Sequence, residues 1–156
     1  MAVSIMRDDV LGFPYAKADG LYIRAKAHAA LTAYVPYLVL PSYDATDDDG
    51  RAATAACAAE ASVRKIVGVP QQAYASGDVA ELLVMGPGKM IVTGATDVAQ
   101  GDYLKIVPGT SAVQAEKDGA ALTESSVALF ADASYTDAAA VAKNIQMWGL
   151  NRVVNT

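Results

Sequence analysis

His28 and Cys57 are the single histidine and the single cysteine of this 156-residue chain. A hydrolase triad would need His28 together with a serine such as Ser42 or Ser62 and an acid, but the sequence has no Gly-x-Ser-x-Gly elbow. Cys57 lies among alanines, where a small buried hydrophobe is expected, and no second histidine could activate it. The residue types therefore predict no catalytic residues, and we expect that the protein is not an enzyme.

Two other stretches resemble ligand-binding motifs. The acidic run that starts at Asp44 and ends before Gly50 has the look of a calcium loop, but the twelfth position counted from Asp44 is Ala55 and not glutamate. Gly86-Pro-Gly-Lys89 shares only Gly-Lys with a phosphate-binding loop. We interpret the first stretch as a solvated acidic loop, whose ion binding stays open, and the second as a β-turn. We expect no metal site and no cofactor.

Composition and charge narrow the possible partners. Hydrophobic residues make up 53% of the chain and charged residues 19%, which excludes a disordered tail protein. Seventeen acids against twelve bases give a net charge of −5, which argues against nucleic acid as a partner. The longest uncharged run, residues 27–43, contains prolines and is shorter than the roughly 20 apolar residues that span a bilayer. We therefore expect no membrane partner, and the N-terminus predicts no secretory leader.

The hydrophobic pattern predicts β structure. Apolar and polar residues alternate from Leu21 to Ala29, which is typical of a half-buried strand. Further strands are expected at 34–40, 63–69, 79–85, 89–93, 103–107, 126–131 and 143–148, separated by glycine-containing turns such as Gly86-Pro-Gly88 and by a polar loop at 110–124. Residues 52–61 could form a helix or a strand, and residues 137–142 a helical turn. The fold class predicted is mainly β, a small antiparallel β-barrel or β-sandwich with an extended N-terminal arm and one or two short helices.

The domain organisation follows from the same pattern. We expect an extended arm over residues 1–20, a single β domain over 21–149 and a C-terminal tail over 150–156. The arm carries large apolar side chains without the period of a helix or strand, so we predict that a partner covers them, although packing on their own domain stays an alternative. These candidate contact residues are Val3, Ile5, Val10, Leu11, Phe13 and Tyr15.

A weak internal similarity links two segments that lie 24 residues apart. Residues 75–84 and 99–107 each begin with an Ala-x-Gly-Asp turn that leads into an apolar strand. Two copies are too few for a solenoid. We interpret the similarity as two hairpins of one barrel that use the same turn chemistry.

Four stretches of the sequence resemble the small capsid decoration (cement, or head-stabilisation) proteins of tailed bacteriophages. They are residues 24–33, residues 67–80 with their Ala-x-Gly-Asp run, residues 88–104 with a second such run before a strand, and the end of the chain at 127–133 and 145–149. The order and spacing of these stretches carry the resemblance. The resemblance covers about residues 60–130 and the chain end.

The resemblance implies a structural virion protein, made in the host cytoplasm, that decorates the outside of an icosahedral capsid. It implies a homotrimer that binds the major capsid protein at local threefold sites, bridges capsomers and stabilises the head. The alternatives are another phage structural β protein, such as a tail-tube, spike or head-fibre component, and a carbohydrate- or peptide-binding module.

Overall fold

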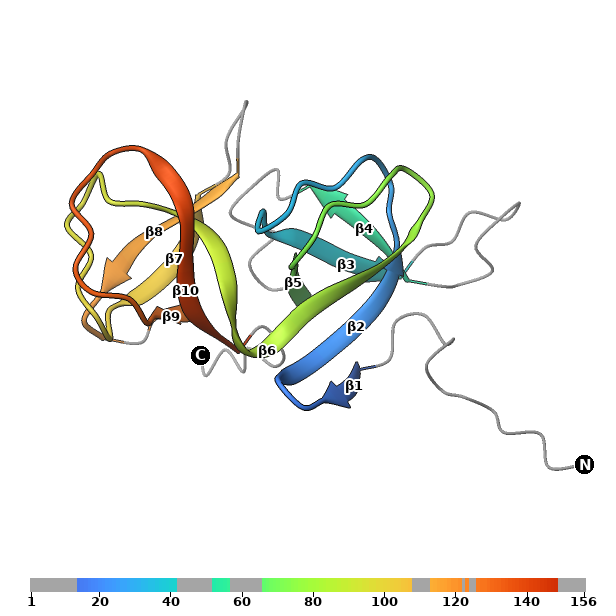
Figure 1. Cartoon of the computed structure of the whole chain (residues 1–156), viewed down its shortest axis with the longest axis horizontal. Helices are drawn as coiled ribbons and strands as arrows, with labels where there is room; N and C mark the ends of the chain where they lie inside the picture. Colours follow the sequence, from blue (N-terminus) through green and yellow to red (C-terminus); the bar gives the residue numbers. More distant parts are fainter. Residues whose placement is uncertain are drawn as a thin grey trace, which may run out of the picture.

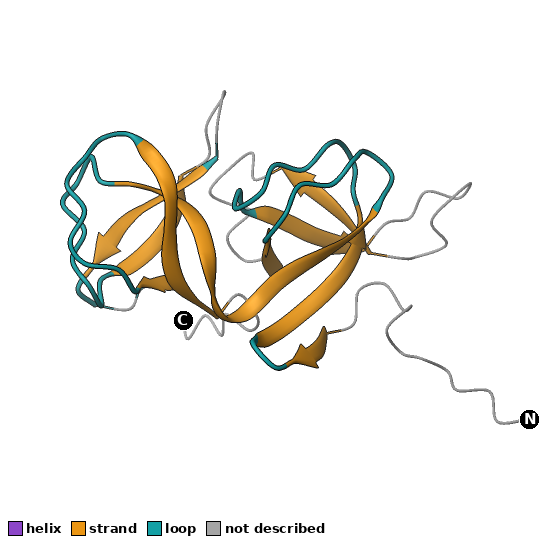
Figure 2. Ribbon diagram, in the orientation of Figure 1, coloured by secondary structure: helices purple, strands orange, loops and turns teal. Residues whose placement is uncertain are grey.

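The computed structural model describes residues 14–41, 52–56, 66–107, 113–121, 123 and 126–148. All regular elements within these ranges are strands (Figure 2). Their bounds are β1 (Pro14–Lys17), β2 (Gly20–Lys26), β3 (Tyr37–Pro41), β4 (Ala52–Ala56), β5 (Ile66–Pro70), β6 (Val79–Thr93), β7 (Tyr103–Val107), β8 (Gln114–Gly119), β9 (Ser126–Phe130) and β10 (Ala140–Trp148). The prediction of a mainly β chain is confirmed.

The 15-residue strand β6 is the centre of the ten-stranded sheet. Its first half pairs with β2 and β5, and its second half pairs with β10. Strands β2, β4, β3, β5 and β6 close one ring, and strands β6, β10, β9, β7 and β8 close another. A parallel pair completes each ring, Lys26↔Ala53 in the first and Val92↔Ala115 in the second. We call these the first ring and the second ring; they lie side by side and are joined through β6 (Figure 1).

The two rings repeat one pattern of pairing. In chain order, β2 to β6 of the first ring correspond to β6 to β10 of the second, and each parallel or antiparallel pairing recurs. The loops repeat too, because three sets of backbone hydrogen bonds recur. In the first ring, Leu31 bonds with Tyr74, the Ala27 N–H donates to the Asp78 carbonyl, and the Tyr34 N–H donates to the Pro70 carbonyl. In the second ring, the same three places are taken by Val98 with Tyr135, by Gly94 N–H with the Asp137 carbonyl, and by Gly101 N–H with the Phe130 carbonyl. The chain is therefore an internal structural duplication.

Two clusters of buried side chains form the core. The first joins residues of the first ring, including Ile23, Val39 and Leu82. The second is centred on the second ring but also contains Leu83 and Val67 of the first. Leu83 and Val67 are fully buried, so this cluster is continuous from one ring to the other.

The predicted turn at Gly86-Pro-Gly88 is wrong, because these residues continue β6. Residues 85–93 pair with β10 without a break, which keeps this stretch extended. Glycine is needed at positions 86 and 88 because neighbouring segments approach the β6 backbone closely there. A Cβ at Gly86, whose φ is 114°, would lie 2.9 Å from the Cα of Gly20, and one at Gly88 would lie 2.3 Å from the Leu83 side chain. The Gly-Pro-Gly run thus lets β6 continue without a break from the first ring into the second.

Other local predictions also need correction. Residues 140–142 begin β10 and are not helical, and the Asp137 carboxylate accepts a hydrogen bond from the Ala139 N–H, 2.9 Å long, just before it. Residues 52–56 form β4, while 57–61 lie outside the described residues. Strand β8 lies within the predicted loop at 110–124.

The prediction of one small barrel or sandwich is not confirmed as stated, because the sheet closes two rings that share a strand. Within the described ranges there is no helix, and so none long and apolar enough to cross a membrane.

Candidate functional site

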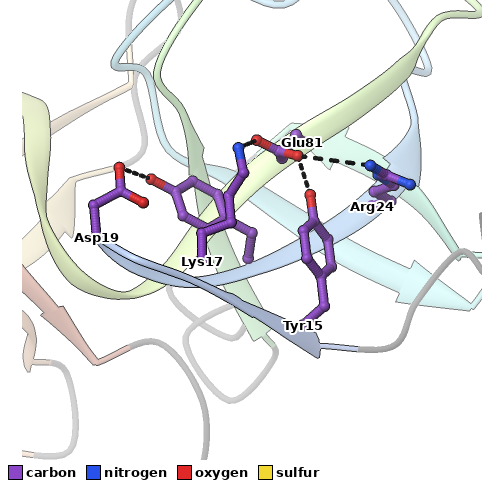
Figure 3. A network of polar contacts seen from close by, with 6 residues as sticks. Tyr15, Lys17, Asp19, Arg24 and Glu81 are labelled. Atoms are coloured by element: carbon purple, nitrogen blue, oxygen red, sulfur yellow. Dashed lines mark hydrogen bonds and ion pairs between the residues drawn. The ribbon is translucent and has the colours of Figure 1, made fainter. Parts of the chain in front are cut away.

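The end of the predicted arm folds onto the first ring. Strand β1 pairs with β2 through the register Tyr15↔Tyr22, so its side chains lie beside those that point outward from β2 and β6. Across β2 and β6, Arg24 lies opposite Glu81. The tight hairpin between β1 and β2 thus gathers six polar side chains on one face, which we call the β1 cluster: Tyr15, Lys17, Asp19, Tyr22, Arg24 and Glu81 (Figure 3).

Glu81 is the centre of the β1 cluster. Its carboxylate accepts hydrogen bonds from the Tyr15 hydroxyl and the Lys17 ammonium, and a guanidinium nitrogen of Arg24 lies 3.9 Å from it. The Tyr22 hydroxyl donates to Asp19 over 2.9 Å. The cations also stack on the rings, with Lys17 Nζ 4.8 Å from the Tyr22 centroid and Arg24 Cζ 5.0 Å from the Tyr15 centroid.

The electrostatics of the β1 cluster favour a charged carboxylate on Glu81 and neutral phenols on Tyr15 and Tyr22. Burial would raise the pKa of Glu81, but hydrogen bonds from Lys17 and Tyr15 and the charges of Lys17 and Arg24 outweigh it, so the pKa is lowered. Burial, with the hydrogen bond to Asp19, raises the pKa of Tyr22 to about 12. Burial and Glu81 likewise raise the pKa of Tyr15. Around β1 the cluster therefore presents a charged Glu81 carboxylate that accepts hydrogen bonds and neutral phenols that donate them.

A shallow open groove adjoins the β1 cluster. Arg24 and Glu81 form one part of its lining, and Gln72, Tyr74 and Val79 form the rest. Val79 is 54% exposed, the largest value among the exposed large hydrophobic residues that the structure describes. The groove combines an ion pair with an amide, a phenol and an apolar contact, which suits recognition of a partner surface.

Of the predicted contact residues, the structure places Tyr15. Its side chain is half-buried against its own sheet, and its hydroxyl is bound to Glu81. Residues Val3, Ile5, Val10, Leu11 and Phe13 lie outside the described residues, as do Cys57 and the acidic run from Asp44. Residues 14–17, which were predicted to belong to the arm, pair with β2 as strand β1, whereas residues 1–13 lie outside the described residues.

The structure also describes His28 and Lys89, the other residues that were considered as candidate site residues. His28 is exposed, and its Nδ1 lies 2.7 Å from the Thr54 hydroxyl oxygen. Lys89 follows the glycines inside β6 and opens no helix. Within the described ranges, no group of three His, Cys, Asp or Glu residues is arranged to hold a metal ion.

Sequence reasoning did not single out Glu81, Arg24 or Lys17. Arg24 was expected to point outward from its strand, and Glu81 belonged to a second predicted strand. The sequence carried no local signal that the strand of Arg24 pairs with the strand of Glu81, because the two strands are far apart in the chain.

No protein-family model matches the sequence, and no curated protein is significantly similar to it. Among solved structures, the fold is similar to the N base of the head fiber protein gp8.5 of bacteriophage phi29. The TM-score is 0.50 and the sequence identity is 14%, and the similarity covers 84% of this chain and 98% of that chain. At this identity the likeness concerns the fold.

Proposed function

We propose that this protein is a structural component of a tailed-phage virion that binds the exterior of the head. The observation that carries the proposal is the shared fold with a head-fiber base, which extends over 98% of that base. In its finer form the proposal is a decoration protein, which binds the major capsid protein as a homotrimer at local threefold sites and bridges capsomers. The sequence resemblance to capsid decoration proteins supports this finer form.

The β1 cluster gives such a protein a fixed point of attachment. Three side chains of the first ring, Glu81, Arg24 and Tyr22, hold β1 against the sheet. Glu81 accepts hydrogen bonds from Tyr15 and Lys17 and forms an ion pair with Lys17, and Arg24 and Tyr22 contact the Tyr15 ring. Residues 1–13 lead directly into this fastened strand and include Val3, Ile5, Val10, Leu11 and Phe13. A contact that these residues make with a capsid subunit would therefore be transmitted to the folded rings.

A second candidate is the base of a head fibre. The likeness to the phi29 head-fiber base favours it specifically, since that is the protein whose fold is shared. In this role the rings would bind the shell and carry a projecting fibre, whereas a decoration protein ends at the shell surface. The two candidates share the capsid contact and differ in what projects from it.

The test is to add the purified chain to expanded, undecorated phage heads and to image them by electron cryomicroscopy. We expect added density over the shell at the local threefold sites, in three copies per site. A variant lacking residues 2–13 should remain folded and lose most of this occupancy, with wild-type protein at the same concentration as the control. Heads that stay bare with the wild-type chain would contradict the proposal, and density confined to one type of site would favour the second candidate.

A further inference from the structure

The first residues of β6 lie at an edge of the sheet. Residues 79–81 pair with β2 on one side, whereas pairing with β5 on the other side begins only at Leu82. Among the described strands, none pairs with residues 79–81 on that other side. The groove beside the β1 cluster, with a volume of about 580 Å³, adjoins this edge, because Val79 and Glu81 both line it.

The direction of the backbone groups at this edge follows from the ladder with β2. The Ala27 N–H donates to the Asp78 carbonyl over 2.8 Å. In an antiparallel pair alternate residues bond across the ladder, so Ala80 is the next residue of β6 whose groups point toward β2. Val79 and Glu81 therefore direct their N–H and C=O groups to the open side. These are the groups with which an added strand would form hydrogen bonds.

The matching edge of the second ring is covered in part by side chains of that ring. There, the Tyr135 hydroxyl donates to the Ala139 carbonyl over 2.5 Å, and Lys143 Nζ lies 4.0 Å from the Tyr135 centroid. The counterpart of Tyr135 in the first ring is Tyr74, which forms the matching bridge with Leu31. The Tyr74 side chain makes no hydrogen bond with another described residue and lines the open groove instead. The first ring thus leaves uncovered an edge that the second ring covers in part.

The side chains along the open edge fit an apolar segment without charge. Val79 is exposed and offers an apolar contact in the groove that the Tyr74 side chain also lines. The charged groups of the groove are already paired, since Glu81 binds Lys17 and lies 3.9 Å from Arg24 (Figure 3). A charged segment would have to compete with these pairs, whereas an uncharged one leaves them intact.

We infer that residues 2–6 of a second copy of this chain add a strand to the open edge of β6. Their sequence, AVSIM, carries no charge, and Val3 and Ile5 lie two positions apart, so both face one side of a strand. The 13 residues before β1 span up to about 43 Å when extended, which is long enough to reach a neighbouring copy. Within one copy, β1 lies on the side of β2 that faces away from β6, so the arm starts two strands from the edge.

This contact joins two different surfaces, the arm of one copy and the β6 edge of the next. Contacts of this head-to-tail kind close into a ring when the rotation between copies allows it. The inference therefore rests on the homotrimer of the proposed function, in which three arms would occupy three edges. It names the receiving surface within the trimer and leaves Val10, Leu11 and Phe13 for the capsid.

Proline at the edge tests the inference in the full chain. Val79→Pro removes an N–H that points to the open side, at the first residue of a strand, so pairing with β2 is retained. We expect light scattering to show a trimer for the wild type. Val79→Pro should raise the concentration at which half of the chains are assembled by about tenfold or more.

The duplication of the rings supplies the matched control. Ala140 is the first residue of β10 and pairs with Thr93 as Val79 pairs with Lys26. Ala140→Pro should assemble like the wild type, because the inference places no arm on the second ring. Circular dichroism and urea denaturation check that both variants remain folded.

A cross-link identifies the copy that provides the strand and does not depend on the proline variant. Ser4→Cys and Gln72→Cys are introduced into separate chains that both carry Cys57→Ala, and the two chains are co-expressed and mildly oxidised. We expect a disulfide-linked dimer of the two chains, because Gln72 lines the groove. Gln100→Cys, at an exposed glutamine of the second ring, is the control and should give no link to Ser4→Cys.

Three results would overturn the inference: the wild type is a monomer, folded Val79→Pro assembles like the wild type, or the co-expressed chains give no link. A link that forms only when both cysteines are on one chain would show that the arm covers its own edge. Binding to phage heads is measured in parallel. Linked trimers that leave the heads bare would contradict the proposed function alone, and decorated heads without the link would contradict this inference alone.

Discussion

The first and second rings use the same backbone pairing with different side chains at matched positions. Where the first ring has the pair Arg24 and Glu81, the second has Ile91 opposite Ala142. The hydrogen bond that Ala27 donates in the first ring is donated by Gly94 in the second. Since the second ring closes without the charged pair, the charges are not required for ring formation. They hold β1, which has no counterpart among the described strands of the second ring.

The comparison also separates turn chemistry from position in the fold. The turns 75–78 and 99–102 are built alike, with an Asp carboxylate that accepts from the Ala N–H at 2.9 and 2.8 Å and a glycine at positive φ. They nevertheless lie at different places in the two rings, since one precedes β6 and the other β7. The similarity seen in the sequence therefore reports a shared turn, while the duplication of the rings lies in the backbone pairing.

The largest effect is expected at the crossing between the rings. Gly86→Ala places a Cβ 2.9 Å from the Gly20 Cα at a φ of 114°, and both clash and strain should lower the free energy of unfolding, by roughly 3 kcal/mol in total. Gly77→Ala is the control, because its φ of 85° is also positive but nothing lies within 4 Å. It should cost about 1 kcal/mol. Urea denaturation measures both, and equal losses would show that close packing at the crossing is unimportant.

Replacing the aspartate of the two Ala-x-Gly-Asp turns should have the next largest effect, and the loss of stability should differ between the turns. Asp102 is buried and accepts from Lys117 over 2.8 Å, whereas Asp78 is exposed. Asp102→Asn should lower the free energy of unfolding by about 2 kcal/mol at neutral pH, and Asp78→Asn should cost less.

The pH dependence of this effect has a definite sign. The hydrogen bond from Lys117 and the Ala99 N–H lower the pKa of Asp102 in the folded protein. The stabilisation that the charged Asp102 carboxylate provides is therefore fully present above the ordinary carboxyl pKa of about 3.9. It is lost as the pH falls through the lower pKa that Asp102 has in the folded protein. The stability gap between wild type and Asp102→Asn should close in acid. A gap that stays constant down to low pH would contradict the role assigned to the ion pair.

The smallest effect on overall stability is expected when the first ring is given second-ring residues. The double variant Arg24→Ile with Glu81→Ala should keep both rings folded and lose at most about 1 kcal/mol. Hydrogen exchange of the β1 amides should become faster, because β1 loses its partners on β6. Removing the Lys105–Glu116 pair of the second ring, 3.4 Å apart, is the control and should leave β1 exchange unchanged. Cooperative unfolding of the first ring in the double variant would show that the charges support the ring itself.

The sequence predicted those strands whose pattern is local. Leu21–Ala29 and Tyr103–Val107 alternate clearly, and strands are found there as β2 and β7. Gly86-Pro-Gly88 looked like a turn because its extended form depends on β10 and on the close approach of Gly20. Strand β8 was missed because its sequence, QAEKDG, is polar and only Ala115 is buried.

The candidate sites depended on contacts that no local pattern reveals. Tyr15 was singled out for its apolar ring, but its partner Glu81 is distant in the sequence. The edge at Val79 gave no signal, since only the strand order shows that no described strand pairs on its other side. Such sites are formed by strand pairing, which a single sequence does not specify.

The shared strand also sets an order for assembly on the ribosome. All strands of the first ring have been synthesised by residue 85, whereas the second ring needs β10, which ends at Trp148. N-terminal parts generally fold first as a chain emerges, so the first ring can close while the rest is still being made. The newly made half of β6 then extends from it as a template on which the second ring is built. Until that happens the first-ring members of the shared cluster, such as Leu83 and Val67, lack its second-ring members, and the nascent chain exposes apolar side chains that can aggregate.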